Sequence, residues 1–207
     1  SMVREGGRIF LRATDAVELS GGELRARSAA ATGGAIDVTA PLVEVREATL
    51  DASGASGGGR IRLGGPRRGG KDGDDSLPTA DTLFVSSGST VRADAEVAGR
   101  GGEIILWSDV ESVLFPTISA RGAGGEAGGF VELSSANRLA WGGQVDAGPG
   151  GTVLFDPKNI VIDAAGVDPA LGQTFISDPD ADSVISPGSI TAILDTGAAL
   201  VLHANTD

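Results

Sequence analysis

The sequence predicts an all-β protein with a single domain, a parallel β-helix wound from coils of about 25 residues. A phrase of two glycines followed by alternating large apolar residues occurs six times, and its second glycines are Gly7, Gly34, Gly59, Gly102, Gly129 and Gly151. A second phrase, apolar residue, variable residue, alanine, stands at residues 24–26, 50–52, 91–93, 118–120 and 145–147. No single coil can bury its own apolar face, so like strands of successive coils are expected to pair in parallel.

The first strand of each coil follows the glycine pair. Its alternate apolar residues face one way, and we expect them to form one internal ladder, Ile9, Ile36, Ile61, Ile104, Val131 and Val153. The glycines are interpreted as a tight corner, because glycine takes positive φ without penalty and lets neighbouring backbone approach closely. The residues between these inward positions point outward and vary between apolar and charged types, which predicts an ordinary exposed face. This outward column consists of Phe10, Asp37, Arg62, Ile105, Glu132 and Leu154.

A weaker middle strand, such as Val43 with Val45 or Leu83 with Val85, and a third strand ending in the alanine phrase complete each coil. One coil is longer by about 16 residues. Its extra segment, residues 64–79, has no apolar period and predicts an inserted surface loop. The first half of this loop is basic and the second acidic, so we expect a solvated loop that pairs its own charges, with a partner or a cation as the alternative.

The period breaks after residue 162. Residues 163–183 are polar and contain prolines, which predicts an excursion from the solenoid. Residues 186–197 predict a short helix, with Ser186 as N-cap, Pro187 in the first helical position and Gly197 as the stop. Residues 199–204 return to a strand.

The amino-acid composition and net charge exclude several classes of partner and site. Glycine makes up 33 of 207 residues, yet 41% apolar residues suffice for a core. A net charge of -12 disfavours nucleic acid and anionic lipid as partners. No apolar run is long enough for membrane insertion. The absence of cysteine excludes disulfides and thiolate metal sites.

Three stretches near the carboxyl end resemble the filamentous-haemagglutinin type of two-partner-secretion exoprotein. They are residues 128–135 (Gly-Gly-Phe-Val-Glu-Leu-Ser-Ser), 145–147 (Val-Asp-Ala) and 151–162 (Gly-Thr-Val-Leu-Phe-Asp-Pro-Lys-Asn-Ile-Val-Ile). Leu133, Val153 and Phe155 replace the usual threonine, tryptophan and leucine of that family, all of them apolar swaps. The resemblance is good over residues 98–207, whereas the earlier coils resemble the family only in their general repeat pattern.

The resemblance implies a right-handed β-helix that is secreted to, or displayed on, the surface of a Gram-negative bacterium. Export would use an outer-membrane β-barrel partner. Asn-Pro-Asn-Gly-like and Asn-Pro-x-Gly-like motifs of the family's secretion domain do not occur in this sequence. The chain is therefore expected to be a piece of the shaft rather than the secretion-targeting end.

Candidate chemistry is sparse. With one histidine, His203, and no cysteine, no Cys-His or multi-histidine site can form within the chain, and we expect no Ser-His-Asp site either. We expect the chain to have no enzymatic activity and no cofactor. His203 is interpreted as an outward strand residue. Asp178, Asp180 and Asp182 alternate as in the opening of a calcium loop, but the glycine and glutamate that complete such a loop are missing, so a solvated acidic turn is expected. Trp107 and Trp141 are interpreted as core or rim residues, with a sugar-binding or partner-binding strip as the alternative.

These observations favour a structural shaft segment of a large bacterial adhesin. Two alternatives stay open. One is a module that binds a glycan, a host cell or a bacterial cell through the inserted loop or the tryptophans. The other is a polysaccharide-active enzyme that uses carboxylates.

Overall fold

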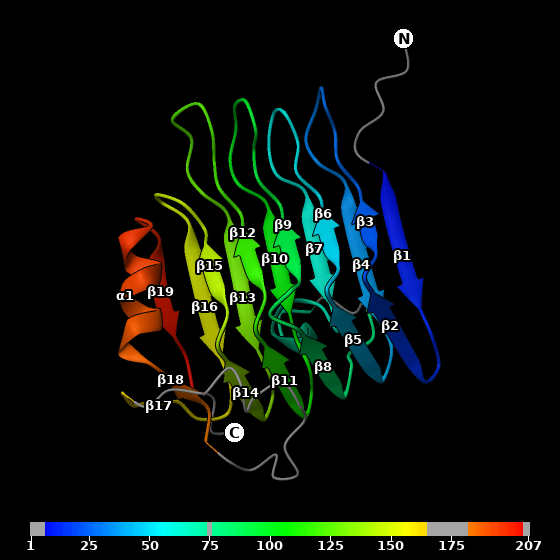
Figure 1. The fold of residues 1–207 in the computed structure, drawn as a ribbon, viewed down its shortest axis with the longest axis vertical. Coiled ribbons are helices and arrows are strands. Elements are labelled where there is room, and N and C mark those ends of the chain that lie inside the picture. Colours follow the sequence, from blue (N-terminus) through cyan, green and yellow to red (C-terminus); the bar gives the residue numbers. More distant parts are fainter. Residues whose placement is uncertain (1–6, 74–75, 165–181, 205–207) are drawn as a thin grey trace.

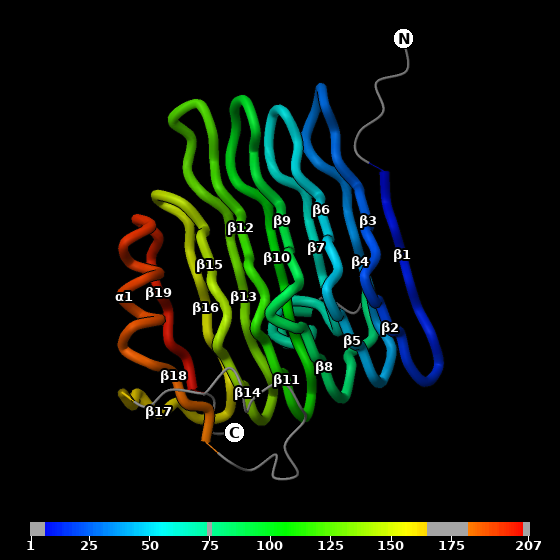
Figure 2. The backbone as a smooth tube through the Cα atoms, in the orientation of Figure 1, coloured from blue at the N-terminus to red at the C-terminus, as the bar shows by residue number. Residues whose placement is uncertain are grey.

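The computed structural model describes residues 7–73, 76–164 and 182–204. They form a parallel β-helix in which successive coils stack side by side, with β1 at one end and α1 with β19 at the other (Figure 1). Figure 2 shows that the connections between coils line up in a row at one edge of the stack. The predicted fold class is confirmed.

The first strands of the coils make a seven-stranded sheet, called sheet A here. It runs β1 (Arg8–Arg12), β4 (Ala35–Thr39), β7 (Arg60–Leu63), β10 (Glu103–Leu106), β13 (Phe130–Ser134), β16 (Thr152–Asp156) and β19 (Ala199–Leu202). The predicted ladder is confirmed, because Ile36 pairs with Ile9 on one side and Ile61 on the other, and the register continues through Val153. Ile36, Ile61, Ile104, Val131 and Val153 are fully buried.

The middle and third strands form two further sheets of five strands each. Sheet B contains β2 (Ala16–Ser20), β5 (Leu42–Arg46), β8 (Thr82–Val85), β11 (Glu111–Leu114) and β14 (Arg138–Trp141). Sheet C contains β3 (Glu23–Arg25), β6 (Thr49–Asp51), β9 (Thr90–Arg92), β12 (Thr117–Ser119) and β15 (Gln144–Asp146). The inward residues of the three sheets meet in one apolar core that runs the length of the stack.

Of the two reasons predicted for the glycine pairs, the structure confirms close approach of neighbouring backbone and not positive φ at the second glycine. None of the second glycines has positive φ, so positive φ is not the reason for a glycine at these positions. They are Gly7, Gly34, Gly59, Gly102, Gly129 and Gly151. Close approach is the physical reason instead. A Cβ on Gly59, Gly102 or Gly129 would lie 2.1 Å from the carbonyl oxygen of the equivalent glycine one coil earlier.

The first glycines face the alanine phrase. A Cβ on Gly101 would lie 2.0 Å from the carbonyl oxygen of Ala120, and one on Gly128 would lie 1.7 Å from that of Ala147. The N–H of Gly129 donates to Ala120 O at 2.7 Å. We call this contact between the two repeated phrases the corner clasp. It explains why the glycines recur opposite the alanine phrase, since a Cβ on the first glycine would meet the backbone of that phrase.

The last coil departs from the three-strand pattern. Strands β17 (Val161–Ile162) and β18 (Val184–Ile185) pair with each other, and α1 (Pro187–Asp195) follows. The predicted helix is confirmed, with the Ser186 side chain accepting from Ser189 N at 3.1 Å and Gly197 at φ 79° just beyond its end. Buried Ile193 joins the helix to the core.

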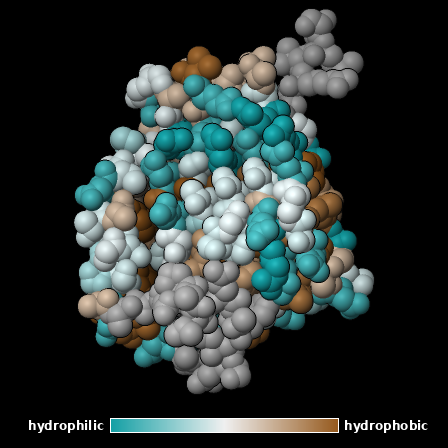
Figure 3. Space-filling model, viewed as in Figure 1, coloured by the Kyte–Doolittle hydropathy of each residue, from teal (hydrophilic) through white to brown (hydrophobic). Residues whose placement is uncertain are grey.

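The surface seen in Figure 3 is mostly hydrophilic or neutral, with hydrophobic side chains in scattered patches. Among the described residues no helix is long and apolar enough to cross a membrane.

Candidate functional site

The inserted loop lies on the outer face of sheet A. It leaves β7, contains a short 3-10 turn, η1 (Arg67–Gly70), and returns to β8. Gly65 and Gly69 pack on the indole of Trp107, since a Cβ at either would lie 2.8 or 2.5 Å from a ring atom. Trp107 is only 3% exposed, and its Nε1 donates to Asp109 Oδ1 at 3.0 Å. The expectation of a solvated loop is wrong for residues 64–66 and Leu77, which are buried, because an aromatic side chain from the next coil offers the loop a surface to cover. The expectation that the loop pairs its own charges is confirmed, since Arg67 Nε and Arg68 Nη1 lie 3.8 and 3.4 Å from carboxylate oxygens of Asp72.

The outward column of sheet A is consequently not an exposed face. Asp37, Arg62, Ile105 and Glu132 are 0–2% exposed and Leu154 is 7% exposed, while Phe10 alone stays open at 46%. The earlier prediction failed because alternation along a strand identifies the inward side but does not show what covers the outward side.

Asp37 and Arg62 form the first buried ion pair under the loop. Arg62 Nε donates to Asp37 Oδ1 at 2.7 Å, and Arg8 Nη2 lies 2.8 Å from Asp37 Oδ2. Burial acts to raise the pKa of Asp37, but the hydrogen bonds from Arg62 and Arg8 and the charges of Arg62 and Arg60 lower it overall. Arg62 Nη1 also donates to Ser76 Oγ at 2.9 Å, which ties the far side of the loop to the sheet.

The second cluster joins Arg68 of the loop to Glu132, Asp156 and His203, and we call it the latch. The Arg68 N–H donates to Glu132 Oε1 at 2.9 Å, and Arg68 Nε donates to Asp156 Oδ2 at 3.2 Å. His203 Nδ1 lies 2.7 Å from Asp156 Oδ1. The side chain of His203 is 45% exposed, as expected for an outward residue.

Burial raises the pKa of Glu132 to about 7, although the Arg68 N–H acts to lower it. A carboxyl group with a raised pKa, such as Glu132, together with a histidine and an arginine is a set that proton-transfer chemistry uses. Here, however, Glu132 is 0% and Asp156 4% exposed. The two carboxylates bind the loop instead of facing a substrate, so the latch is a structural contact between distant coils.

The calcium candidates stay untested. Asp178 and Asp180 lie outside the described residues, and Asp182 Oδ1 accepts from Asn159 Nδ2 at 2.5 Å. Within the described part of the chain, no group of three or more acidic or histidine side chains could hold a metal ion.

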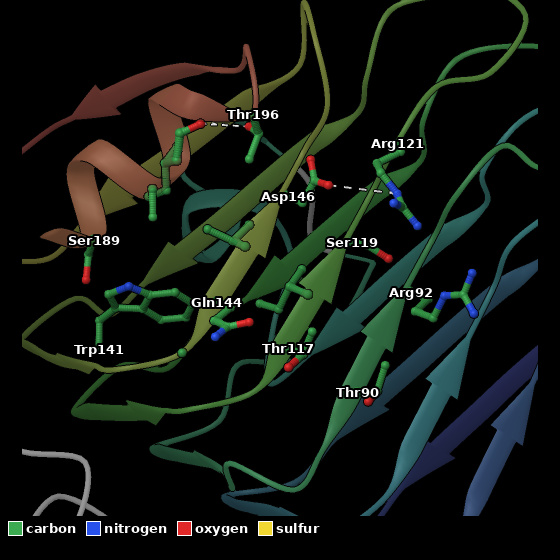
Figure 4. A pocket seen from close by; sticks show the side chains of 15 residues that line it. Thr90, Arg92, Thr117, Ser119, Arg121, Trp141, Gln144, Asp146, Ser189 and Thr196 are labelled. Carbon is green, nitrogen blue, oxygen red and sulfur yellow. Dashed lines mark hydrogen bonds and ion pairs between the residues drawn. The ribbon is translucent and has the colours of Figure 1, made fainter.

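A cleft of about 490 Å³ lies elsewhere, between α1 and the outer face of sheet C (Figure 4). Thr117 and Gln144 stand on its floor, Ser189 and Thr196 on its helix wall, and Trp141 beside Ser189 at one end. The buried Trp141 ring packs edge-on against Phe155, which confirms it as a core residue. The sequence does not reveal this cleft, because α1 and sheet C come together only in the folded chain.

No protein-family model matches the chain, and no curated protein matches it either. Its function is therefore inferred from the fold, the contacts above and the sequence phrases.

Proposed function

We propose that the chain is a structural shaft segment of a large secreted or surface-exposed bacterial adhesin. The observation that carries this proposal is the stack itself. Seven first strands lie side by side in one sheet with one unbroken apolar core behind them. Such a stack gives a rigid rod whose length grows by about 4.8 Å for each coil.

The outer contacts support the same role. Asp37 with Arg62, and Glu132 and Asp156 with Arg68, join different coils to one another or to the inserted loop. Covered carboxylates that bind neighbouring coils favour stiffness over catalysis, so we propose no enzymatic activity and no cofactor. Export by two-partner secretion through an outer-membrane β-barrel partner rests on the resemblance of residues 128–162 to that family.

A segment swap in the parent protein tests the shaft proposal. Residues 7–204 would be replaced by an unrelated parallel β-helix with the same number of coils. Surface display and the distance from the cell to the distal end, measured by electron microscopy, should be retained. A swap that keeps the fold and display but abolishes adhesion would contradict a purely structural role. Export that does not depend on a barrel partner in the same host would contradict the secretion route.

A further inference from the structure

The cleft beside α1 has the dimensions and access of a small-ligand site. Its volume of about 490 Å³ lies within the range of about 300–1,000 Å³ that is typical of such sites. It exists because α1 takes the place of a third strand, and a helix is wider than a strand. The helix stands beside the edge strand β15 and forms a wall, while the outer face of sheet C forms a floor.

The floor carries a column of neutral polar side chains. Thr90, Thr117 and Gln144 are aligned by the register of β9, β12 and β15. Thr117 and Gln144 are exposed, and none of the three side chains hydrogen-bonds to another described residue. Hydroxyl and amide groups that are spaced by one coil, about 4.8 Å, can donate to and accept from successive hydroxyls of a ligand.

The charged side chains that line the cleft are Arg92, Arg121 and Asp146, and the buried Asp94 behind this lining set balances them. Asp94, which is 3% exposed, accepts from Arg92 Nη2 at 3.1 Å and from the Arg121 N–H at 2.7 Å. Arg121 Nε also lies 3.9 Å from Asp146 Oδ2, the pair joined by a dashed line in Figure 4. Two guanidiniums thus meet two carboxylates, so the rim offers planar hydrogen-bonding groups without net charge.

Trp141 supplies an unsatisfied donor at one end of the cleft. It is 2% exposed, and its Nε1 has no hydrogen-bond partner in the described structure. A buried donor without a partner is unfavourable, because it has lost its hydrogen bond to water. A ligand oxygen that enters this end would accept from the indole and remove the penalty. The wall adds the exposed side chain of Ala192, a small apolar contact for the face of a ring, and beside it the largely buried Ile193.

From these features we propose that the cleft binds a neutral saccharide. Its hydroxyls would contact the column Thr90, Thr117 and Gln144, and its apolar ring face would lie against the wall at Ala192. The site is independent of the shaft role, because it uses the outside of the coils and not their stacking.

Tryptophan fluorescence gives a direct test, since the chain has two tryptophans. In the Trp107→Phe variant the emission comes from Trp141 alone. This protein is titrated with neutral tetrasaccharides built from glucose, galactose, mannose or N-acetylglucosamine, and with trigalacturonate as the acidic counterpart. We expect a saturable change with at least one neutral sugar, and no dependence of its affinity on salt, because no charge is neutralised.

Matched variants locate the site. Gln144→Ala and Thr117→Ala should each weaken binding about tenfold, and Ala192→Phe should abolish it by filling the cleft. Thr49→Ala changes the same column two strands from Thr117, outside the cleft, and should leave affinity unchanged. Circular dichroism checks that each variant is folded. Binding of trigalacturonate alone, binding that survives Ala192→Phe, or no response of the folded protein to any neutral sugar would overturn the proposal. The segment swap above cannot give any of these results, so failure of one proposal leaves the other standing.

Discussion

Arg68 donates its backbone N–H to Glu132 Oε1 at 2.9 Å, across 64 residues of sequence. Arg68 has φ of 50°, a left-handed conformation that costs a non-glycine residue roughly 1–2 kcal/mol. That conformation persists because the latch and the stacking on Trp107 hold the loop in place. The inserted loop is therefore an ordered part of the fold.

Glu132 should make the protein less stable as pH rises from about 4.5 to about 7. Its pKa is raised from 4.5 to about 7, so over this window the folded state holds a proton that the unfolded state has released. Stability falls with pH wherever the folded state binds more protons, by about 1.4 kcal/mol for each unit of pKa difference. Asp37 has the opposite effect on the pH dependence of stability, because its pKa is lowered from the usual 3.8. Its contribution to stability is fully present above pH 3.8 and is lost only as the pH falls below that value, outside the window of Glu132.

Glu132→Gln should flatten this pH dependence, because glutamine still accepts from Arg68 and does not titrate. Urea unfolding at about pH 5 and about pH 8 measures the effect. Glu103→Gln, at a half-buried position of the same sheet, is the control. If stability falls by the same amount between these two pH values in the Glu132→Gln variant and in the unsubstituted protein, Glu132 is not the titrating group.

The corner clasp predicts that glycines of the same phrase differ in their tolerance of alanine. Gly128→Ala places a Cβ 1.7 Å from Ala147 O and should destabilise the fold by several kcal/mol, since backbone must move. Gly7→Ala meets nothing within 4 Å and should be neutral or stabilise by about 0.4–1 kcal/mol. Equal denaturation midpoints for the two variants would contradict the clasp.

Replacing residues 66–76 by a short Gly-Ser bridge should destabilise the protein by more than about 1 kcal/mol. Loop closure itself changes little with length, but the deletion uncovers Trp107 and removes the Arg68 partner of Asp156. The emission of Trp107 should shift to longer wavelength, and a Trp141→Phe background isolates that signal. An unchanged midpoint and emission would mean that the loop does not cover the sheet in solution.

Calcium should leave the melting temperature unchanged. A ligand present at about one hundred times its Kd would add about 2.7 kcal/mol, a shift that a thermal melt resolves easily. A clear increase that disappears in Asp180→Ala would restore the calcium interpretation of Asp178, Asp180 and Asp182. Magnesium at the same concentration is the control for general ionic effects.

The coils could be predicted from the sequence because the pattern of apolar residues that defines each strand is local and recurs in every coil. Ile36 and Val38 mark the inward side of one strand, and the same spacing in every coil fixes which strands pair. The reason for the glycines was only half right, since their crowding comes from the neighbouring coil and not from their own φ.

The outer contacts could not be predicted, because they join distant segments that lack a pattern. The partners of Arg68 on sheet A, Glu132 and Asp156, are 64 and 88 residues away, and nothing in the loop sequence points to them. The cleft had a faint signal. Thr49, Thr90 and Thr117 each stand directly before the apolar residue of the alanine phrase, and only the position of α1 shows which part of this column borders a cavity.

The path of the inserted loop has a mechanical consequence. Hydrogen bonds between coils run along the rod, so a pull on its two ends would peel coils off one at a time, each under a small force. The loop begins in the third coil, covers Trp107 of the fourth and reaches Glu132 and Asp156 in the fifth and sixth. It therefore works as a lengthwise strut, and these coils should part together at one higher force peak in a single-molecule pulling trace.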